Sequence, residues 1–295
     1  MTTLYYAVGG GFGHVTRAQW VLRTLGYDAA GDVTILARAT LPEYVRHTIN
    51  YDVLAVPEAL SCDLAAYRFW LQELLATQRV QQLLLDTFPA GIVGEFCDVA
   101  WPPNLRVHLV ARWLTWEVYR SVASFLPFRF ATTSIIEPLS AEYQAVLQTC
   151  SDSMTSFPAL LVLPSSGAMA AAEARSLCSQ LSLPPSFWLI VHSGPADEIV
   201  QLVHYTQDLM QEEGKAQPLV LIAPCCPRDV APSVLWRQFY PASVLFPAAD
   251  RIITGCGFNL MRETEPYQQK HWFVPFVRRY DDQFARAARR RATNT

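Results

Sequence analysis

Short apolar runs alternate along this chain with stretches of helical periodicity. The first run, Leu4 to Val8, ends in glycines, and apolar residues then recur at helical spacing until Gly26. The same half holds strand-like runs at 33–37, 52–56, 83–85 and 107–111, and a helical stretch at 64–80. Because strands that are apolar throughout must be covered on both faces, this alternation predicts a parallel sheet between helices.

A second alternation begins after a stretch rich in proline and serine. Strands are expected at 187–191, 219–223, 251–254 and 273–274, with helices at 197–213 and from near Phe258. Residues 158–167 are the expected linker, because the stretch from Phe157 to Gly167 carries prolines and a Ser-Ser-Gly sequence. The prediction is therefore an α/β protein with two doubly wound, Rossmann-like domains, 1–157 and 168–295, facing a cleft.

The composition limits the classes of partner. Of the 295 residues, 51% are hydrophobic and 17% charged, which is enough to fill two cores and argues against disorder. The net charge of −3 gives no global basic field, so nucleic acid is not an expected partner. The N-terminus lacks the features of a signal peptide, and no run approaches the ~20 apolar residues of a membrane span. A cytoplasmic protein is expected, with contact at the inner face of a membrane left open.

Metal-binding and redox patterns are missing from the sequence. The seven cysteines form no C-x-x-C pair, and they are expected to be buried thiols in a reducing cytoplasm. The histidines show no H-x-x-x-H spacing, and the aspartates form no D-x-D pair. The sequence therefore predicts a protein that needs no metal and no cofactor.

A glycine-rich loop, Gly9 to His14, follows the first expected strand. Glycines let the backbone approach a ligand closely, and the following helix N-terminus favours an anion. His14 is a candidate general base, and the alternative is a buried or capping histidine. The dinucleotide fingerprint is incomplete, since His14 takes the place of its third glycine. Arg38 ends the second strand and suits a 2′-phosphate, so an NADP-binding oxidoreductase stays an alternative, beside a plain tight turn.

A second glycine loop, Thr254 to Gly257, lies between a strand and a helix in the other half. Glu263 follows Gly257 by six residues, or about 9 Å along a helix. A diphosphate at the helix start would leave its ribose within reach of Glu263, whereas the plain alternative is a solvated helix carboxylate. His192 to Pro195 opens another helix after a strand and offers further N–H groups to phosphate.

The C-terminal residues add two more features. Asp281, Asp282 and Gln283 follow Pro275 and a basic loop, and such carboxylates and amides can bind sugar hydroxyls. The alternative is a plain loop. Several arginines come next and could attract an anionic partner or a membrane surface, although a plain solvated helix face or an unordered tail is the favoured interpretation: Arg286, Arg289, Arg290 and Arg291.

Together these motifs resemble a known family. The GGGFGH loop with Thr16 and Arg17 is similar to the N-terminal loop of GT-B glycosyltransferases related to the bacterial lipid-II-forming N-acetylglucosaminyltransferase. The GCGFN loop with Glu263, then Pro275 and Asp-Asp-Gln, resembles the donor site of that superfamily, which includes UDP-glycosyltransferases. Segments 86–89, 94–95 and 239–250 add to the resemblance, which covers both halves of the chain.

The resemblance implies that the second half binds a nucleoside-diphosphate sugar, with UDP as the expected nucleotide. Glu263 would bind the ribose hydroxyls, and Asp282 and Gln283 the donor sugar. The remaining implied contacts are mostly backbone groups, at Ser193, Gly194, Gly255, Gly257, Phe258 and Asn259 for the diphosphate and at Leu245 and Phe246 for the base. Two residues depart from the family. Thr254 stands where related plant enzymes have a histidine, and Arg286 stands where many relatives have an asparagine.

On the acceptor side, the resemblance implies His14 as general base. Asp86 ends a strand at the same edge of the sheet, and it could orient His14 or replace it as the base. The implied glycine loop consists of Gly9, Gly10, Gly11, Gly13 and Arg17. The expected enzyme is bacterial and transfers a hexosyl or N-acetylhexosaminyl group to a hydroxyl of an unknown acceptor, a lipid or a small molecule. Inversion is expected, because no two glutamates in the second half have the spacing found in many retaining relatives. A non-catalytic nucleotide-sugar-binding protein of this fold is a further alternative.

Overall fold

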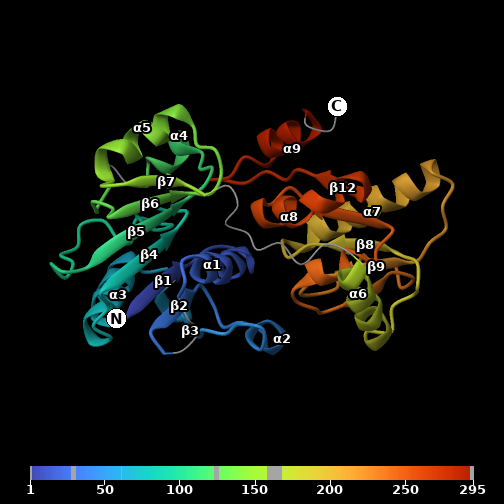
Figure 1. Cartoon of the computed structure of the whole chain (residues 1–295), viewed down its shortest axis with the longest axis horizontal. Coiled ribbons are helices and arrows are strands. Elements are labelled where there is room, and N and C mark those ends of the chain that lie inside the picture. The colour runs from blue at the N-terminus through green and yellow to red at the C-terminus, as the bar shows by residue number, and fades with distance from the viewer. Residues whose placement is uncertain (1, 28–30, 61, 123–125, 158–167, 293–295) are drawn as a thin grey trace. The chain divides into compact units, whose positions relative to one another are not determined.

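The structure is a computed structural model that describes residues 2–27, 31–60, 62–122, 126–157 and 168–292. Contacts divide these residues into two compact units, each with its own sheet (Figure 1). The first unit comprises the described residues within Met1–Pro42, Ile49–Val162 and Arg278–Asp282, and the second those within Glu43–Thr48, Leu163–Val277 and Gln283–Thr295. The linker expected at 158–167 lies outside the described residues.

The sheet of the first unit has seven parallel strands in the order β3-β2-β1-β4-β5-β6-β7. The strands are β1 (Thr3–Ala7), β2 (Val33–Ala37), β3 (Asp52–Ala55), β4 (Gln82–Asp86), β5 (Arg106–Ala111), β6 (Thr132–Ile135) and β7 (Met154–Ser156). The strand order reverses between β1 and β4. In open α/β sheets, ligands bind beyond the carboxyl ends of the strands at such a reversal.

Five helices of the first unit lie within the described residues, and two of them show a clear start or stop signal. They are α1 (Gly13–Thr24), η1 (Glu58–Leu60), α3 (Leu64–Thr77), α4 (Trp116–Tyr119) and α5 (Ala141–Cys150). Asp63 caps α3 by accepting the Ala66 N–H at 3.0 Å. Gly26, at a φ of +74°, ends α1 as expected, because a left-handed residue there lets the chain leave the helix.

The sheet of the second unit has five parallel strands in the order β10-β9-β8-β11-β12, and its order reverses between β8 and β11. The strands are β8 (Trp188–Val191), β9 (Leu219–Ile222), β10 (Leu235–Arg237), β11 (Arg251–Gly255) and β12 (His271–Val274). The helices are α2 (Glu43–Arg46), α6 (Ala168–Gln180), α7 (Ala196–Glu212), η2 (Ala242–Leu245), α8 (Phe258–Glu263), η3 (Glu265–Lys270) and α9 (Gln283–Ala292).

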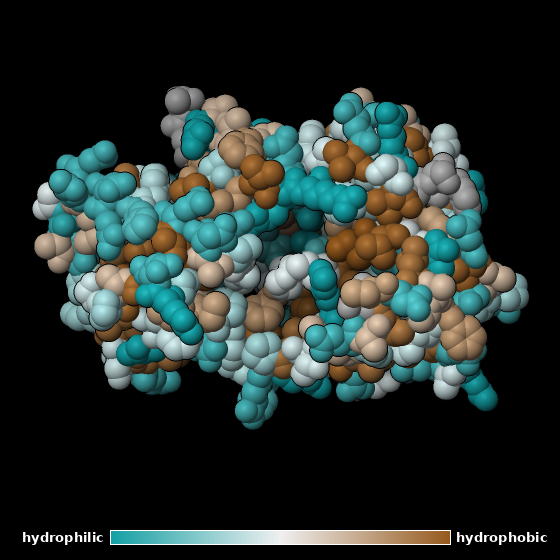
Figure 2. Space-filling view, turned by 180° about the vertical axis from the view of Figure 1, so that it is seen from behind, coloured by the Kyte–Doolittle hydropathy of each residue, from teal (hydrophilic) through white to brown (hydrophobic). Residues whose placement is uncertain are grey.

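Both faces of the central strands are buried, which explains why those strands are apolar throughout. Along β8, Trp188 and Ile190 pack into one hydrophobic cluster, while Leu189 and Val191 pack into another. Successive side chains of a strand point to opposite faces, so the two clusters cover the two sides of the sheet. Outside the cores, hydrophobic and hydrophilic residues are interspersed on the face that Figure 2 shows.

The predicted architecture, an α/β protein with doubly wound parallel sheets, is confirmed. The strands β6, β7 and β10 were not predicted, because two are only three residues long and β6 is rich in threonine and serine. Among the described helices, none is both long and apolar enough to cross a membrane.

Candidate active site

The glycine loop and Asp86 meet where the first sheet reverses its order. His14 lies in the first turn of α1, just after β1, and Asp86 is the last residue of the adjacent β4. The imidazole of His14 folds back over Gly9, where an added Cβ would lie 2.1 Å from Nε2. Only glycine therefore leaves room for the ring at this position.

His14 and Asp86 form a buried pair. The Nδ1 atom of His14 lies 2.6 Å from Oδ2 of Asp86, and Arg17 donates from Nε to Oδ1 at 2.7 Å and from Nη2 to Oδ2 at 2.6 Å. Burial alone would raise the pKa of Asp86, but Arg17 and His14 outweigh it and hold that pKa well below its usual range. The ionised carboxylate can only accept, so Nδ1 carries the proton and Nε2 is the basic nitrogen.

The surroundings keep the imidazole neutral. Burial lowers the pKa of His14, and the positive charges of Arg17 and Arg112 lower it further, while Asp86 acts in the opposite direction. The ring also stacks on Phe88, with centroids 5.9 Å apart. A neutral histidine with a fixed tautomer is ready to accept a proton, as a general base must. The arginine that the sequence assigned to the glycine loop is thus bound to Asp86.

Sequence reasoning missed the partners that extend this cluster. Arg112 follows β5 and donates from Nε to Oγ1 of Thr87 at 3.1 Å and from Nη1 to Oδ1 of Asp281 at 2.9 Å. Arg17 donates to the same Thr87 hydroxyl at 3.2 Å. Thr87 has a φ of +73°, which β-branched residues rarely adopt. The one available signal was position, because Arg112 and Thr87 follow the ends of adjacent strands.

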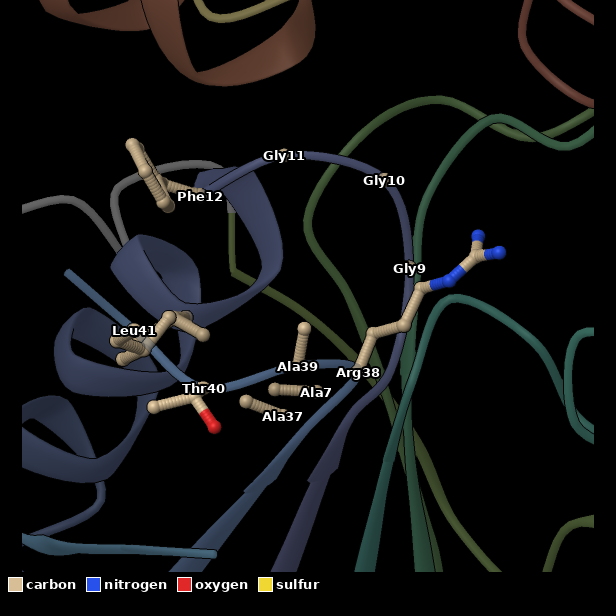
Figure 3. Close-up of a pocket in the computed structure, with 11 residues that line it drawn as sticks. Ala7, Gly9, Gly10, Gly11, Phe12, Ala37, Arg38, Ala39, Thr40 and Leu41 are labelled. Atoms are coloured by element: carbon tan, nitrogen blue, oxygen red, sulfur yellow. The ribbon is translucent and has the colours of Figure 1, made fainter. Parts of the chain in front are cut away.

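A pocket of about 350 Å³ lies at the carboxyl ends of β1 and β2, between the glycine loop and residues 37–41 (Figure 3). It is lined by Ala7, Gly9, Gly10, Gly11, Phe12, Val15, Ala37, Arg38, Ala39, Thr40 and Leu41. Arg38 is exposed and is the one charged residue of this lining. The pocket thus brings together the glycines and the arginine on which the NADP-binding alternative depends.

In the second unit, two loops pack against one histidine. His192 follows β8, and its Nε2 lies 2.7 Å from Oε2 of Glu198 in α7. An added Cβ at Gly194 would lie 2.4 Å from Nε2 of His192, and one at Gly255 would lie 3.2 Å from its Cε1. The ring therefore brings the loop after β8 together with the loop after β11, where the sheet reverses its order. Sequence reasoning named His192 only as part of its loop and missed Glu198.

The residues expected to contact the diphosphate lie in or near these loops. Ser193 is exposed, Gly194, Gly257 and Asn259 are half-buried, and Gly255 and Phe258 are buried. Gly257 is the N-cap residue of α8 and Pro195 that of α7, and neither makes a side-chain capping bond. Thr254, which stands where related plant enzymes have a histidine, forms a hydrogen bond between its Oγ1 and Nε2 of His271 at 2.8 Å.

Glu263 is the last residue of α8, and only 7% of it is exposed. The expectation of a solvated carboxylate as its alternative is therefore wrong. Burial raises the pKa of Glu263 to about 8, although a hydrogen bond from Ser243 works against that rise. Ser243 belongs to η2, which leads into Leu245 and Phe246, and both of their side chains are fully buried. The hydrogen bond from Ser243 thus connects Glu263 to η2, the element that ends at Leu245.

Asp282 and Gln283 are adjacent in sequence but belong by contacts to different units. Gln283 is buried, and its Oε1 accepts the Phe276 N–H at 3.0 Å. Arg286 is also buried and donates to the Cys256 carbonyl at 2.8 Å, and Arg290 donates to the Met261 carbonyl. Two of the C-terminal arginines are thus bonded to the region around α8, while Arg289 and Arg291 are exposed.

The expectation for the cysteines is partly wrong. None of the seven described cysteines forms a disulfide, but Cys62, Cys225 and Cys226 are exposed rather than buried, since these three lie outside the packed core. Among the residues that the structure describes, no three side chains of histidine, cysteine, aspartate or glutamate are grouped so that they could hold a metal ion.

Comparison with known proteins adds to this picture at the level of fold. No family model matches the chain, and no curated protein matches it by sequence. A UDP-bound structure of MnaA from S. aureus is 11% identical with a TM-score of 0.60, covering 98% of this chain and 82% of its own. UDP-N-acetylglucosamine 2-epimerase from Rickettsia bellii is 10% identical with a TM-score of 0.59, covering 96% and 81%.

A transferase shows the same similarity. The glycosyltransferase SsfS6 from Streptomyces sp. SF2575, in complex with thymidine diphosphate, is 13% identical with a TM-score of 0.55 and covers 99% of this chain and 86% of its own. Identities this low establish a shared fold. With its two doubly wound units, the chain has the fold of GT-B glycosyltransferases, as the sequence motifs indicated.

Proposed function

We propose that the protein transfers a sugar from a nucleoside-diphosphate donor, UDP-linked, to an acceptor hydroxyl. The observation that carries the proposal is the 2.6 Å pair of His14 and Asp86 at the point where the first sheet of a GT-B fold reverses its order. A neutral imidazole held by an ionised carboxylate is suited to deprotonating a hydroxyl group.

In the first unit, Nε2 of His14 would take the acceptor proton as the acceptor oxygen attacks the anomeric carbon. The C–O bond to the donor phosphate breaks in the same displacement, so the anomeric configuration inverts. Asp86 would stabilise the imidazolium that forms, and its Nδ1 contact would hold the ring in position. Asp86 could not easily be the base itself, because its contacts with Arg17 favour the ionised form and weaken it as a proton acceptor.

In the second unit, backbone groups near Gly194 and Gly257 would bind the diphosphate at the N-terminal ends of α7 and α8. The amides and helix dipoles would stabilise the leaving diphosphate as charge builds on it. Glu263 would accept the ribose hydroxyls. Since its pKa is about 8 in the unliganded protein, the hydroxyl donors would favour ionisation, and nucleotide binding would release a proton. UDP in MnaA and thymidine diphosphate in SsfS6 make a nucleoside diphosphate the first ligand to test.

The test measures nucleotide release from a panel of UDP-, GDP-, dTDP- and ADP-sugars, each incubated with lipid-linked and small-molecule acceptors. We expect release of one nucleotide that depends on an acceptor, and a sugar adduct with the anomeric configuration opposite to that of the donor. Excess chelator should leave the rate unchanged, because helix termini rather than a cation would neutralise the diphosphate. A product that retains the configuration, or activity that chelator abolishes and Mg²⁺ or Mn²⁺ restores, would contradict this mechanism.

A second candidate function is epimerisation of a nucleotide sugar. It is favoured by the similarity in fold to the UDP-N-acetylglucosamine 2-epimerase, whose TM-score of 0.59 exceeds the 0.55 of SsfS6. An epimerase needs no acceptor and must exchange a proton on the sugar. Incubation with UDP-N-acetylglucosamine alone in D₂O separates the two functions, because only an epimerase would give a new sugar epimer that carries deuterium on its ring.

The location and the acceptor are also proposals. Exposed Arg289 and Arg291 could bind an anionic membrane surface, which would suit a lipid acceptor at the inner face of a bacterial membrane. Replacing both with glutamine should then reduce binding to anionic vesicles without changing nucleotide affinity. Equal vesicle binding by the variant and the wild type would leave these arginines as an ordinary solvated helix face.

A further inference from the structure

A C-terminal segment of the chain is bound into the first unit beside His14. Residues Arg278–Asp282 belong to that unit by contacts, although they lie far from it in sequence. Asp281 forms an ion pair with Arg112 at 2.9 Å, and the side chains of the pair are only 13% and 10% exposed. Arg112 and Arg17 donate to the same hydroxyl of Thr87, and Arg17 binds Asp86. A continuous series of polar contacts therefore joins Asp281 to His14.

An aromatic series joins the same segment to the same histidine. The ring of Tyr280 packs edge-on against Phe88, with centroids 5.7 Å apart, and Phe88 stacks on His14. The Tyr280 carbonyl accepts the Thr115 N–H at 3.0 Å, which fixes the backbone of the segment next to the ring contacts. Two independent sets of contacts, one charged and one aromatic, thus end at the imidazole of His14.

We propose that Arg112 and Asp281 are positioning residues that set the proton affinity of His14 through their paired charges. The consequence for catalysis rests on the proposed function, in which His14 is the base. The effect on the histidine itself does not, since it follows from the contacts alone. Asp282, which was expected to contact the donor sugar, directly follows Asp281. The same contacts therefore connect the segment that contains Asp282 to His14, the proposed base.

The charges around His14 determine the signs of the effect. Four charged or titratable groups lie close to His14 or beside Arg17, namely Asp86 from β4, Arg17 from α1, Arg112 after β5 and Tyr5 from β1. A fifth group, Asp281, interacts with Arg17 and forms the ion pair with Arg112. Arg112 disfavours a second positive charge on His14, so removing it favours protonation. Removing Asp281 leaves Arg112 uncompensated and disfavours protonation. The two substitutions must therefore act in opposite directions.

The experiment is an NMR titration of the histidine rings in the full-length protein, with the His14 signal assigned by its loss in His14→Gln. We expect the His14 pKa to rise by about half a pH unit in Arg112→Met and to fall by a similar amount in Asp281→Asn. The double variant should titrate close to the wild type. In Arg112→Lys, which keeps the charge, the His14 pKa should also stay close to the wild-type value. This variant serves as the alternative if Arg112→Met does not fold.

A purely structural role makes a different prediction. Both single variants would then loosen the cluster and shift the His14 pKa in the same direction, and the two shifts would add in the double variant. That pattern, or an Arg112→Met variant whose His14 titrates at or below the wild-type pH, would overturn the proposal. The matched control is the exposed pair Arg129 and Asp152 of the same unit, whose neutralisation should leave His14 unchanged.

The titration and the activity assay can fail separately. Where transfer is observed, the acidic limb of its pH–rate profile should move with the His14 pKa in each variant. Opposite shifts of His14 without any transferase activity would remove the proposed function and leave the positioning effect in place. If activity depends on His14 but the His14 pKa is the same in both variants as in the wild type, the proposed function stands and the positioning effect is wrong.

Discussion

The two units bury a carboxyl group in opposite ways. In the first unit, Asp86 is fully buried but bound by Arg17 and His14, so its pKa lies well below the usual range. In the second, Glu263 is almost as buried but has a hydroxyl, from Ser243, as its stabilising contact, and its pKa rises to about 8. The difference lies in the partner rather than in the burial. The first unit therefore keeps a charged carboxylate, whereas Glu263 would become charged at neutral pH only if a bound ligand supplied further hydrogen-bond donors, as proposed for the ribose.

The two histidines at the sheet reversals make a related contrast. His192 takes its carboxylate from Glu198, in the helix that follows it, whereas Asp86 comes from a strand 72 residues beyond His14. Each ring rests on a glycine, Gly194 in one unit and Gly9 in the other. A local pair holds two loops of one unit together. The long-range pair instead requires β1 and β4 to be paired in the folded first sheet.

The largest effect is expected for His14→Gln. We predict a turnover lower by about 10²–10⁴-fold, the usual contribution of a general base, with the dissociation constant for the donor unchanged. Steady-state kinetics and calorimetry measure the two quantities. His192→Gln changes the corresponding histidine of the other unit. If it lowers turnover as much as His14→Gln, with donor affinity also unchanged, the two histidines do not differ in role. Normal turnover by His14→Gln would leave the residue with a structural part only.

Asp86→Asn should lower the free energy of unfolding by about 3–5 kcal/mol, because it leaves the buried guanidinium of Arg17 without its counter-charge. Urea denaturation at neutral pH measures the change. The wild-type contribution of Asp86 is present above the carboxyl's unfolded pKa and is lost as pH falls toward the lower folded value. The difference in free energy of unfolding between variant and wild type should therefore become smaller in acid. A difference that grows in acid would contradict an ionised Asp86 in the folded protein.

Glu263→Gln should show the opposite dependence on pH. A carboxyl whose folded pKa is raised stabilises the protein below its unfolded pKa, and that contribution is lost as pH rises toward about 8. The variant cannot ionise, so its stability relative to the wild type should improve between pH 5 and pH 8, by an amount on the order of 3 kcal/mol. Denaturation curves at both pH values test this. A constant difference would mean that Glu263 is already ionised in the unliganded protein.

Much of the first site was predictable because it follows from topology. Strands that end in a glycine loop and in Asp86 become neighbours in a doubly wound sheet, so the approach of His14 to Asp86 needed no knowledge of tertiary contacts. The pairing of Arg112 with Asp281 was not predictable, since it joins residues 169 positions apart and leaves no periodic signal. The burial of Glu263 depends on how a six-residue helix packs, and sequence spacing does not report packing.

In the proposed mechanism the second unit binds the nucleotide, and the first unit takes the acceptor proton. The most direct test is calorimetric titration of UDP and NADP into the wild type, Glu263→Gln and Arg38→Ala, with UDP repeated in two buffers of different ionisation enthalpy. We predict that the wild type binds UDP with release of a proton, that Glu263→Gln binds it about tenfold more weakly without that release, and that Arg38→Ala matches the wild type. UDP affinity unchanged in a folded Glu263→Gln, or tight NADP binding that Arg38→Ala abolishes, would contradict the claim and move the nucleotide to the pocket of the first unit.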